Sequence, residues 1–218
     1  MGKVIAIDGP SGAGKSTIAR TLARLLGFGY LDTGALYRAA ALFLLERGVK
    51  PEDDDEALIR ELDASRIRFK GGRVFLHERD VSDEIRTPEV GHYSSVFSAR
   101  KAVRDFLLEV QRNAAVDQDV VVEGRDTTTV VFPAAWRKFY LDASIGERTR
   151  RRFKQMKETG LVITEEEAEK DVVLRDTRDQ GRSIAPLRKA EDAIIINTTD
   201  KGIEQVLDAI LSHIRSES

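Results

Sequence analysis

The sequence predicts an α/β fold in which helices cover both faces of a parallel sheet. Short apolar runs without polar alternation recur along the chain, at residues 4–7, 28–31, 119–123, 139–141 and 193–196. Helical patterns separate these runs, and the length of 218 residues is typical of one domain. Continuous apolar strands separated by helices indicate a parallel sheet that is buried on both faces.

Strands and helices alternate from the N-terminus onward. The strand at 4–7 leads into a glycine-rich turn, after which Ile18, Leu22 and Leu26 recur at helical spacing until Gly27 ends the pattern. The strand at 28–31 precedes an apolar helix at about 35–47. Further helices are expected at about 99–115, 146–158, 165–181 and 202–215.

One segment, at about 63–88, interrupts this alternation. Residues 66–69 and 74–77 are strand-like, and Gly71-Gly72 between them is typical of a tight antiparallel hairpin. Residues 81–85 are expected to add a third short strand. The acid-rich stretch just before the insert, at 51–63, is expected to be a solvated loop and the start of a helix.

The composition excludes several classes of protein. A net charge of −2 argues against a protein that coats nucleic acid or an anionic membrane. There is no cysteine, so disulfides, thiolate catalysis and Cys-ligated metals are excluded. The N-terminal apolar run is too short for a signal peptide, and no run approaches the length of a membrane span. We therefore expect a soluble, cytoplasmic protein without nucleic-acid polymer or membrane partners.

Residues 9–16, Gly-Pro-Ser-Gly-Ala-Gly-Lys-Ser, fit the phosphate-binding loop (P-loop) G-x-x-x-x-G-K-[ST] between a strand and a helix. Its glycines let backbone N–H groups point into one concavity, and the following helix N-terminus adds partial positive charge. Lys15 is expected to reach the β- and γ-phosphates, and the Ser16 hydroxyl to bind Mg²⁺. A glycine-rich turn with an unrelated lysine is the alternative interpretation. The pattern predicts a nucleoside triphosphate site formed by Gly9, Pro10, Ser11, Gly12, Ala13, Gly14, Lys15, Ser16 and Thr17.

This loop alone does not identify the reaction, because switches, motors, transporters and kinases share it. Guanine-specific switches usually carry Asn-Lys-x-Asp, and the nearest stretch, Asn-Thr-Thr-Asp at 197–200, lacks the lysine. The Leu-Ser-Gly-Gly-Gln signature of transporter ATPases is not found in the sequence.

A second group of charged residues favours a kinase. The strand at 119–123 ends in Glu123, which is expected to hold Mg²⁺ and is followed by Arg125 and Asp126 at the sheet edge where ligands bind. A surface ion pair that caps a turn is the alternative. The segment at 32–38 also has two interpretations. In the structural one, Asp32 or Thr33 caps the helix that follows. In the functional one, Arg38, one turn into that helix, faces an acceptor phosphate.

Two further clusters have both a structural and a functional interpretation. The basic run at 148–157 is either a solvated helix face or a mobile lid whose arginines close over phosphates. Arg175, Asp179 and Arg182 fall on one helix face, either as a salt-bridge stripe or as ligands of a nucleotide.

With these segments together, the sequence resembles the bacterial cytidylate (CMP) kinases, a family of P-loop nucleoside monophosphate kinases, over nearly its full length. The resemblance is carried by residues 7–17, 31–38, 83–87, 124–126, 129–133, 175–179 and 185–187. It implies a P-loop NTPase-type core at about 1–34, 117–145 and 183–218. It also implies a region for the acceptor nucleotide at about 35–116, which includes the antiparallel insert, and a helical lid at about 146–182.

The family resemblance also implies roles for particular residues. Arg38 and Arg125 match positions that hold the CMP phosphate, with Thr33 beside them. The positions that read the cytosine are matched by Ser95, Arg104, Asp126 and Arg182, and the positions near the ribose are matched by Arg175 and Asp179. The expected catalytic residues are Lys15, Arg125, Arg148 and Arg152, and the expected metal ligands are Ser16 and Glu123.

The resemblance predicts that a monomer transfers phosphate from ATP, with Mg²⁺, to CMP or dCMP. The competing hypotheses are a P-loop kinase for uridylate, adenylate or shikimate, and an ATP-binding switch without an acceptor. Three departures from the family pattern are Thr33, Asn197 and the pair Thr127-Thr128. The last replaces an apolar residue and Gly. Because β-branched residues avoid positive φ, we expect the loop after Asp126 to differ from the family's.

Overall fold

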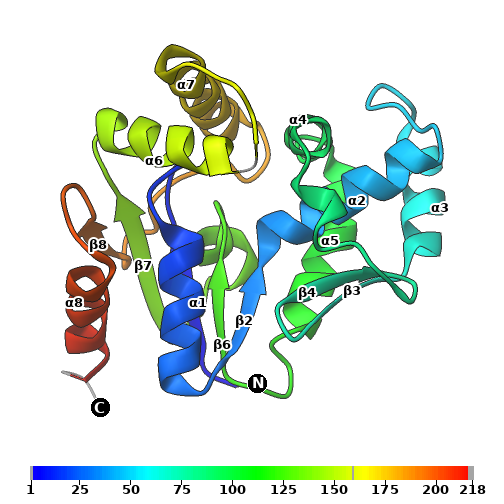
Figure 1. Cartoon of the computed structure of the whole chain (residues 1–218). Coiled ribbons are helices and arrows are strands. Elements are labelled where there is room, and N and C mark those ends of the chain that lie inside the picture. Colours follow the sequence, from blue (N-terminus) through cyan, green and yellow to red (C-terminus); the bar gives the residue numbers. More distant parts are fainter. Residues whose placement is uncertain (1, 159, 216–218) are drawn as a thin grey trace.

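A computed structural model describes residues 2–158 and 160–215 of the chain. At its centre lies a parallel five-stranded sheet with the strand order β2-β6-β1-β7-β8 (Figure 1). Because β1 and β6 are buried throughout, they need no polar face, which is why their sequences are apolar without alternation. This arrangement confirms the predicted fold class. The strands are β1 (Val4–Asp8), β2 (Gly29–Asp32), β6 (Val120–Glu123), β7 (Arg137–Asp142) and β8 (Ile194–Asn197).

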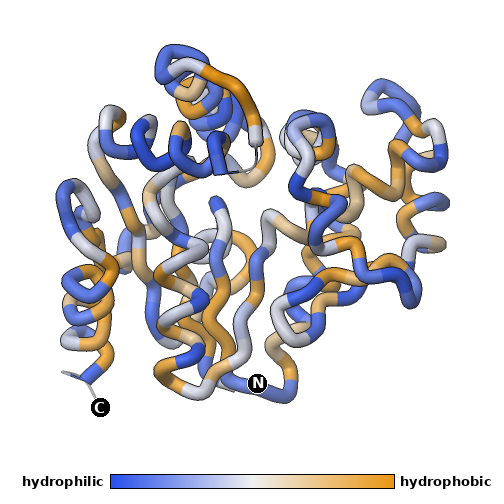
Figure 2. The backbone as a smooth tube through the Cα atoms, viewed as in Figure 1, coloured by the Kyte–Doolittle hydropathy of each residue, from blue (hydrophilic) through white to orange (hydrophobic). Residues whose placement is uncertain are grey.

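Successive residues of the central strands contribute to two separate cores. Ile5 and Ile7 pack with α1 (Lys15–Leu26) and α8 (Ile203–Arg215) on one face. Val4 packs on the other face with α2 (Thr33–Glu46) and α5 (Lys101–Asn113). Side chains of a strand alternate between faces, so the same short strand holds helices on both sides. Figure 2 shows hydrophobic residues concentrated in the sheet and hydrophilic ones along the upper helix α6 (Ile145–Glu158).

Removing one methylene from the centre of this sheet tests the packing. Ile5 is 0% exposed, whereas Ile195 on β8 is 56% exposed. We expect Ile5→Val to lower the free energy of unfolding by about 0.5–1.5 kcal/mol, because the vacated space is only partly filled. The matched change Ile195→Val is expected to have a much smaller effect. Urea unfolding of both variants measures the difference, and equal losses would contradict this account of the core.

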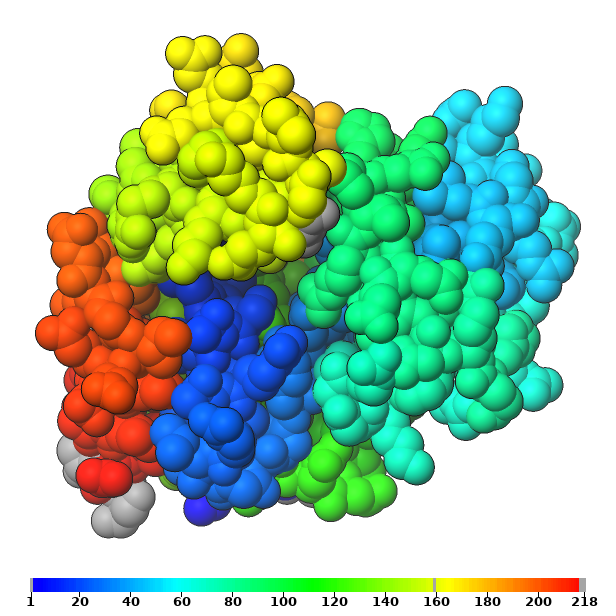
Figure 3. All heavy atoms as spheres, viewed as in Figure 1, coloured from blue at the N-terminus to red at the C-terminus, as the bar shows by residue number. Residues whose placement is uncertain are grey.

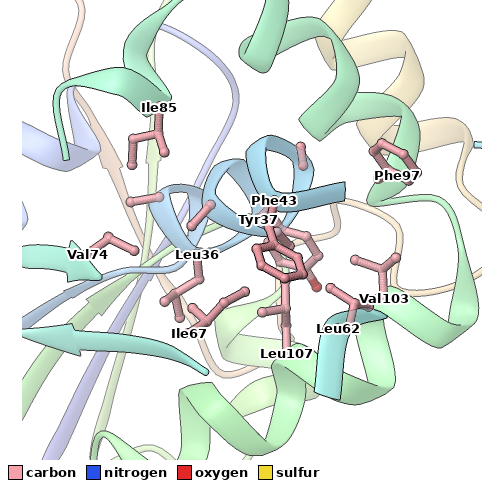
Figure 4. Packing of buried hydrophobic residues seen from close by; sticks show 14 of the residues in the cluster. Leu36, Tyr37, Phe43, Leu62, Ile67, Val74, Ile85, Phe97, Val103 and Leu107 are labelled. Atoms are coloured by element: carbon pink, nitrogen blue, oxygen red, sulfur yellow. The ribbon is translucent and has the colours of Figure 1, made fainter. Parts of the chain in front are cut away.

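The second core extends into a unit built on α2, α3 (Asp55–Ser65), α4 (Pro88–Phe97) and α5. Figure 4 shows Leu36 and Phe43 of α2 among side chains from the neighbouring elements, including Leu62 and Leu107. The side chain of Asp32 caps α2 by accepting the N–H of Ala35 at 3.0 Å, so this aspartate, rather than Thr33, is the cap. The unit places α4 and α5 beside the carboxyl edge of β6.

A small antiparallel sheet of β3 (Ile67–Lys70), β4 (Arg73–Leu76) and β5 (Arg79–Asp80) completes this unit, which confirms the predicted insert. Gly71 and Gly72 both have positive φ, the conformation that a two-residue hairpin turn requires. The predicted strand at 81–85 is wrong. The third strand ends at Asp80, where the Asp80 carboxylate accepts the N–H of Ser82 and turns the chain into a 3₁₀ turn at Glu84–Arg86.

Two helices, α6 and α7 (Glu165–Gly181), cross above the sheet as a separate layer (Figure 1). Thr164 and Glu167 form a reciprocal capping box at the start of α7, which explains where that helix begins. In the described ranges no helix is long and apolar enough to cross a membrane.

The chain after Asp126 forms a five-residue π-helical turn, η2 (Thr127–Val131). In the described part of the chain, the non-glycine residues with positive φ are Arg66, His77, Ala185 and Asp200. Thr127 and Thr128 therefore adopt no conformation that their β-branched side chains disfavour. π-Helical turns are rare and occur often at functional sites.

Candidate functional site

A cleft of about 730 Å³ lies at the carboxyl edge of the sheet. The P-loop forms its floor, α4 lines one side, and α6 and α7 lie over it; Figure 3 shows the hollow beneath α6. Gly9, Pro10, Arg104 and Arg148 stand outside its lining. The other residues predicted for the site line it, namely Ser11, Gly12, Ala13, Gly14, Lys15, Ser16, Thr17, Thr33, Arg38, Ser95, Glu123, Arg125, Asp126, Arg152, Arg175, Asp179 and Arg182.

The P-loop has the backbone that phosphate binding requires. Gly9, Gly12 and Gly14 all have positive φ, and Gly14 directly precedes α1. A Cβ on Gly12 would lie 2.7 Å from the carbonyl oxygen of Arg148, so a side chain there would push α6 away from the loop. The buried Lys15 donates from Nζ to the carbonyl of Pro10 at 2.7 Å. The loop and its lysine thus form a positively polarised cradle.

Beside the cradle, oxygen ligands gather around Glu123. The carboxylate accepts the Ser16 hydroxyl at 2.9 Å and the Tyr30 hydroxyl at 2.6 Å. Mg²⁺ prefers oxygen ligands and commonly takes one or two from protein, with phosphate and water supplying the rest. A serine hydroxyl and a carboxylate at the mouth of a phosphate loop fit that chemistry.

Burial and nearby charges of the same sign shift the pKa values of Lys15 and Glu123. Burial, with the charge of Arg125, lowers the pKa of Lys15. Burial and the nearby Asp32 raise the pKa of Glu123. Each group needs the other's charge, or that of a ligand, to stay ionised away from water.

Four arginines that belong to different segments of the chain line another part of the cleft: Arg38, Arg125, Arg152 and Arg175. Burial, with the charges of Arg175 and Arg86, lowers the pKa of Arg38 to about 10. Burial, with Arg125 and Arg152, also lowers the pKa of Arg175. A Cβ on Gly91 of α4 would lie 3.0 Å from Arg38 Nη1, so glycine there leaves space for the guanidinium. Partly buried guanidinium groups that repel one another form a strong site for an anion.

Carboxylates of α7 hold three of these arginines in place. Asp171 accepts from Arg152 Nε at 2.8 Å and lies 4.0 Å from Arg175 Nη1. Asp179 accepts from Arg125 Nε at 2.7 Å. The arginines are therefore ordered before any ligand binds, which lowers the entropy cost of binding it.

A third part of the cleft carries paired polar groups suited to a flat polar ligand. Asp126 forms a buried ion pair with Arg104, whose Nη1 also donates to the Ser98 carbonyl at 3.1 Å. Arg182 bonds Asp179 and donates to Ser98 Oγ at 2.8 Å. The Ser95 hydroxyl is buried and has no hydrogen-bond partner among the described residues. A buried hydroxyl without a partner is costly, so its place in the cleft favours a ligand that satisfies it.

Some of the predicted residues make contacts that differ from the expected ones. Arg148 donates from Nε to Ala143 O at 3.1 Å and from Nη1 to Ser11 O at 3.1 Å, and it pairs with Asp176. It joins α6, α7 and the P-loop behind the cleft. The Thr33 hydroxyl donates to the Glu123 carbonyl at 2.7 Å. Catalysis by Arg148 and substrate binding by Thr33 stay predictions.

Several residues that contact the site were not predicted from the sequence. Asp171 lies four residues before Arg175 and continues the face of Asp179 and Arg182, so the same spacing could have found it. Tyr30 lies in a short strand with no local signal for its bond to Glu123. Asp176 likewise has no local sequence signal for its contact with the P-loop, in which its carboxylate accepts the Ser11 N–H at 2.8 Å.

The matching family model and the similar curated proteins point to the same family. A family model described as cytidylate kinase matches residues 5–216. The cytidylate kinase of Thermodesulfovibrio yellowstonii is 48% identical over 222 residues, covering 100% of both chains. That of Thermosipho melanesiensis is 46% identical and covers 98% of this chain and 97% of its own. A crystal structure of an uncharacterized Eubacterium ventriosum protein aligns over 99% of both chains with 13% identity and a TM-score of 0.56, which bears on the fold alone.

Proposed function

The chain belongs to the cytidylate kinase family, and we propose that it transfers the γ-phosphoryl group of ATP to CMP or dCMP, giving ADP and CDP or dCDP. The observation that carries this proposal is the pairing of two phosphate sites in one cleft. The P-loop and Lys15 form one, and the arginine cluster forms the other. A triphosphate-binding switch would need the first site without the second.

The donor half of the cleft is suited to ATP with Mg²⁺. The P-loop N–H groups and Lys15 would bind the phosphates of ATP, and Ser16 and Glu123 would hold Mg²⁺. The metal supplies positive charge that neutralises the phosphoryl oxygens during transfer. Tyr30 donates to Oε1 of Glu123, while Ser16 donates to Oε2, so both carboxylate oxygens are restrained.

The acceptor half needs to align a phosphate rather than activate it. The phosphate of a nucleoside monophosphate is already an anionic nucleophile, so no general base is required. Arg38 and Arg125 would hold it in line with the γ-phosphoryl group, while Arg152 and Arg175 spread the transition-state charge. Closure of α6 and α7 over the cleft would keep water from hydrolysing ATP.

The paired polar groups account for a preference for cytosine. The 4-amino group of cytosine donates to Asp126, and its O2 and N3 accept from arginine or from the Ser95 hydroxyl. Uracil has a carbonyl in place of that amino group, which would face the carboxylate of Asp126. Such a buried mismatch costs on the order of 1–3 kcal/mol.

Tyr30 provides a smaller test of the metal site. Because its hydroxyl is one of the two side-chain hydroxyls that donate to Glu123 in the described part of the chain, we expect Tyr30→Phe to raise the Mg²⁺ concentration for half-maximal activity about fivefold, the equivalent of one hydrogen bond. Tyr93→Phe, a change on α4 away from the cleft, is the matched control. An unchanged Mg²⁺ requirement in Tyr30→Phe would show that Tyr30 does not support Mg²⁺ binding by Glu123.

One assay tests the function as a whole. Purified protein is given ATP with CMP, dCMP, UMP, AMP, GMP, dTMP or shikimate, and ADP formation is measured for each. We expect CMP and dCMP to give the fastest turnover. Preference for UMP would overturn the assigned base recognition, and slow ADP release independent of acceptor would favour a switch. We further propose that the enzyme works in the cytoplasm and as a monomer. The monomer is supported by a cleft in which one chain supplies residues of both proposed phosphate sites.

A further inference from the structure

Asp126 occupies the position from which an aspartate usually caps a helix, yet its side chain does not do so. It precedes η2, and no hydrogen bond joins its side chain to the N–H groups of that turn. Its carboxylate instead pairs with Arg104 at the edge of the cleft. Aspartate is among the preferred caps because its carboxylate accepts the free N–H groups of the first turn. Those groups of η2 must therefore be satisfied by another acceptor.

The acceptor is Asp8, the last residue of β1. Its Oδ1 accepts the N–H of Thr127 at 2.9 Å and the hydroxyl of Thr127 at 2.7 Å. Its Oδ2 accepts the N–H of Thr128 at 2.7 Å and the hydroxyl of Thr128 at 2.6 Å. Asp8 and the two threonines are fully or almost fully buried. An acid 119 residues earlier in the chain thus caps the turn that begins after Asp126.

We propose that Asp8, through Thr127 and Thr128, is a positioning residue for base recognition, because it takes over the capping of η2 and leaves the Asp126 carboxylate free to face Arg104 and the base. This inference rests on the proposed function, in which Asp126 accepts from the amino group of cytosine. The two hydroxyls double the number of donors to Asp8, from two N–H groups to four. They orient the carboxylate, so it cannot rotate away and leave the N–H groups for Asp126 to cap.

Thr127 and Thr128, which depart from the family pattern, have a role in this arrangement. An apolar residue and glycine at 127 and 128 would supply the two N–H donors but neither hydroxyl. With threonine at both positions, the position of the loop is set by side chains as well as by the backbone. Substitution can therefore remove the two hydroxyl hydrogen bonds to Asp8 while the two backbone N–H hydrogen bonds stay in place.

The test compares T127V/T128V with T127S/T128S. Valine has nearly the shape of threonine but lacks the hydroxyl, whereas serine keeps it. For T127V/T128V we expect the ratio of kcat/KM for CMP to that for UMP to fall roughly tenfold, as the loss of a well-placed charged hydrogen bond would cause. The KM for ATP should stay within about twofold, because the P-loop contacts are unchanged. T127S/T128S should keep the ratio of the unmodified protein.

Two further variants keep the test decisive. Asp8→Asn places an amide donor against the fixed N–H groups and should lower the same ratio, which supports the proposal by a second route. Ile5→Val loosens the same sheet without touching η2, so it should leave the ratio unchanged. If a folded T127V/T128V protein keeps its CMP preference, the inference is overturned. If the unmodified protein itself shows no preference for CMP over UMP, the proposed function fails instead.

Discussion

Replacing Arg125 with alanine is expected to lower kcat with ATP and CMP on the order of a thousandfold, the effect of losing an arginine that stabilises transferred phosphoryl charge. The residue lines the cleft, and its Nε is held by Asp179 at 2.7 Å. Its guanidinium is expected to touch the acceptor phosphate and the group in transit, so its loss removes an interaction strongest in the transition state. Affinity for ATP should change little, because the P-loop and Lys15 are untouched.

Steady-state kinetics and direct ATP titration together measure this result. Arg125→Lys keeps the charge without the planar fork and should recover only part of the activity. Arg24→Ala, on the exposed side of α1, is the matched control for the loss of an arginine. Full turnover by Arg125→Ala would remove Arg125 from the mechanism, and a parallel loss of ATP affinity would place it in the donor site.

Replacing Asp126 with asparagine is expected to lower kcat/KM for CMP by about a hundredfold and to narrow or abolish the preference over UMP. The Asp126 carboxylate is buried against Arg104, and both side chains are 6% exposed. Asparagine presents an amide that donates to the uracil carbonyl as readily as it accepts from the cytosine amino group. The buried Arg104 also loses its counter-charge, which should destabilise the folded protein.

The ratio of the two substrates on one enzyme preparation separates these effects. A loss of folded protein lowers both rates equally, so a change in the CMP-to-UMP ratio reports on recognition. Urea unfolding measures the stability change independently. Should the variant keep the ratio of the unmodified protein, Asp126 would not be the residue that reads the base.

Most of the fold could be predicted from local sequence signals. The unbroken apolar runs at 4–7 and 119–123 indicated buried parallel strands, and Gly71-Gly72 indicated the hairpin. The third strand of the insert was misplaced because Asp80 accepts the N–H of Ser82 and ends it, an interaction that hydropathy does not reveal. η2 was likewise not predicted, since its cap comes from β1.

The candidate site divides in the same way. The P-loop is one contiguous segment, so its glycines, Lys15 and Ser16 could be assigned from spacing alone. Tyr30 could not, because its bond to Glu123 joins residues 93 apart that meet only when β2 lies beside β6. Arg148 was expected over the phosphates, yet it lies between Ser11 and Asp176.

The sequence by itself therefore located the P-loop, where we propose that the donor phosphates bind, and the residues available to hold an acceptor. Only the tertiary structure decided the partners of those residues: Asp179 pairs with Arg125, Asp171 with Arg152, and Asp126 with Arg104. The physical reason is reach. A P-loop is specified by backbone torsions within a few neighbouring residues, whereas a long arginine can pair with any of several carboxylates. The packing of α5, α6 and α7 around the cleft selects among them.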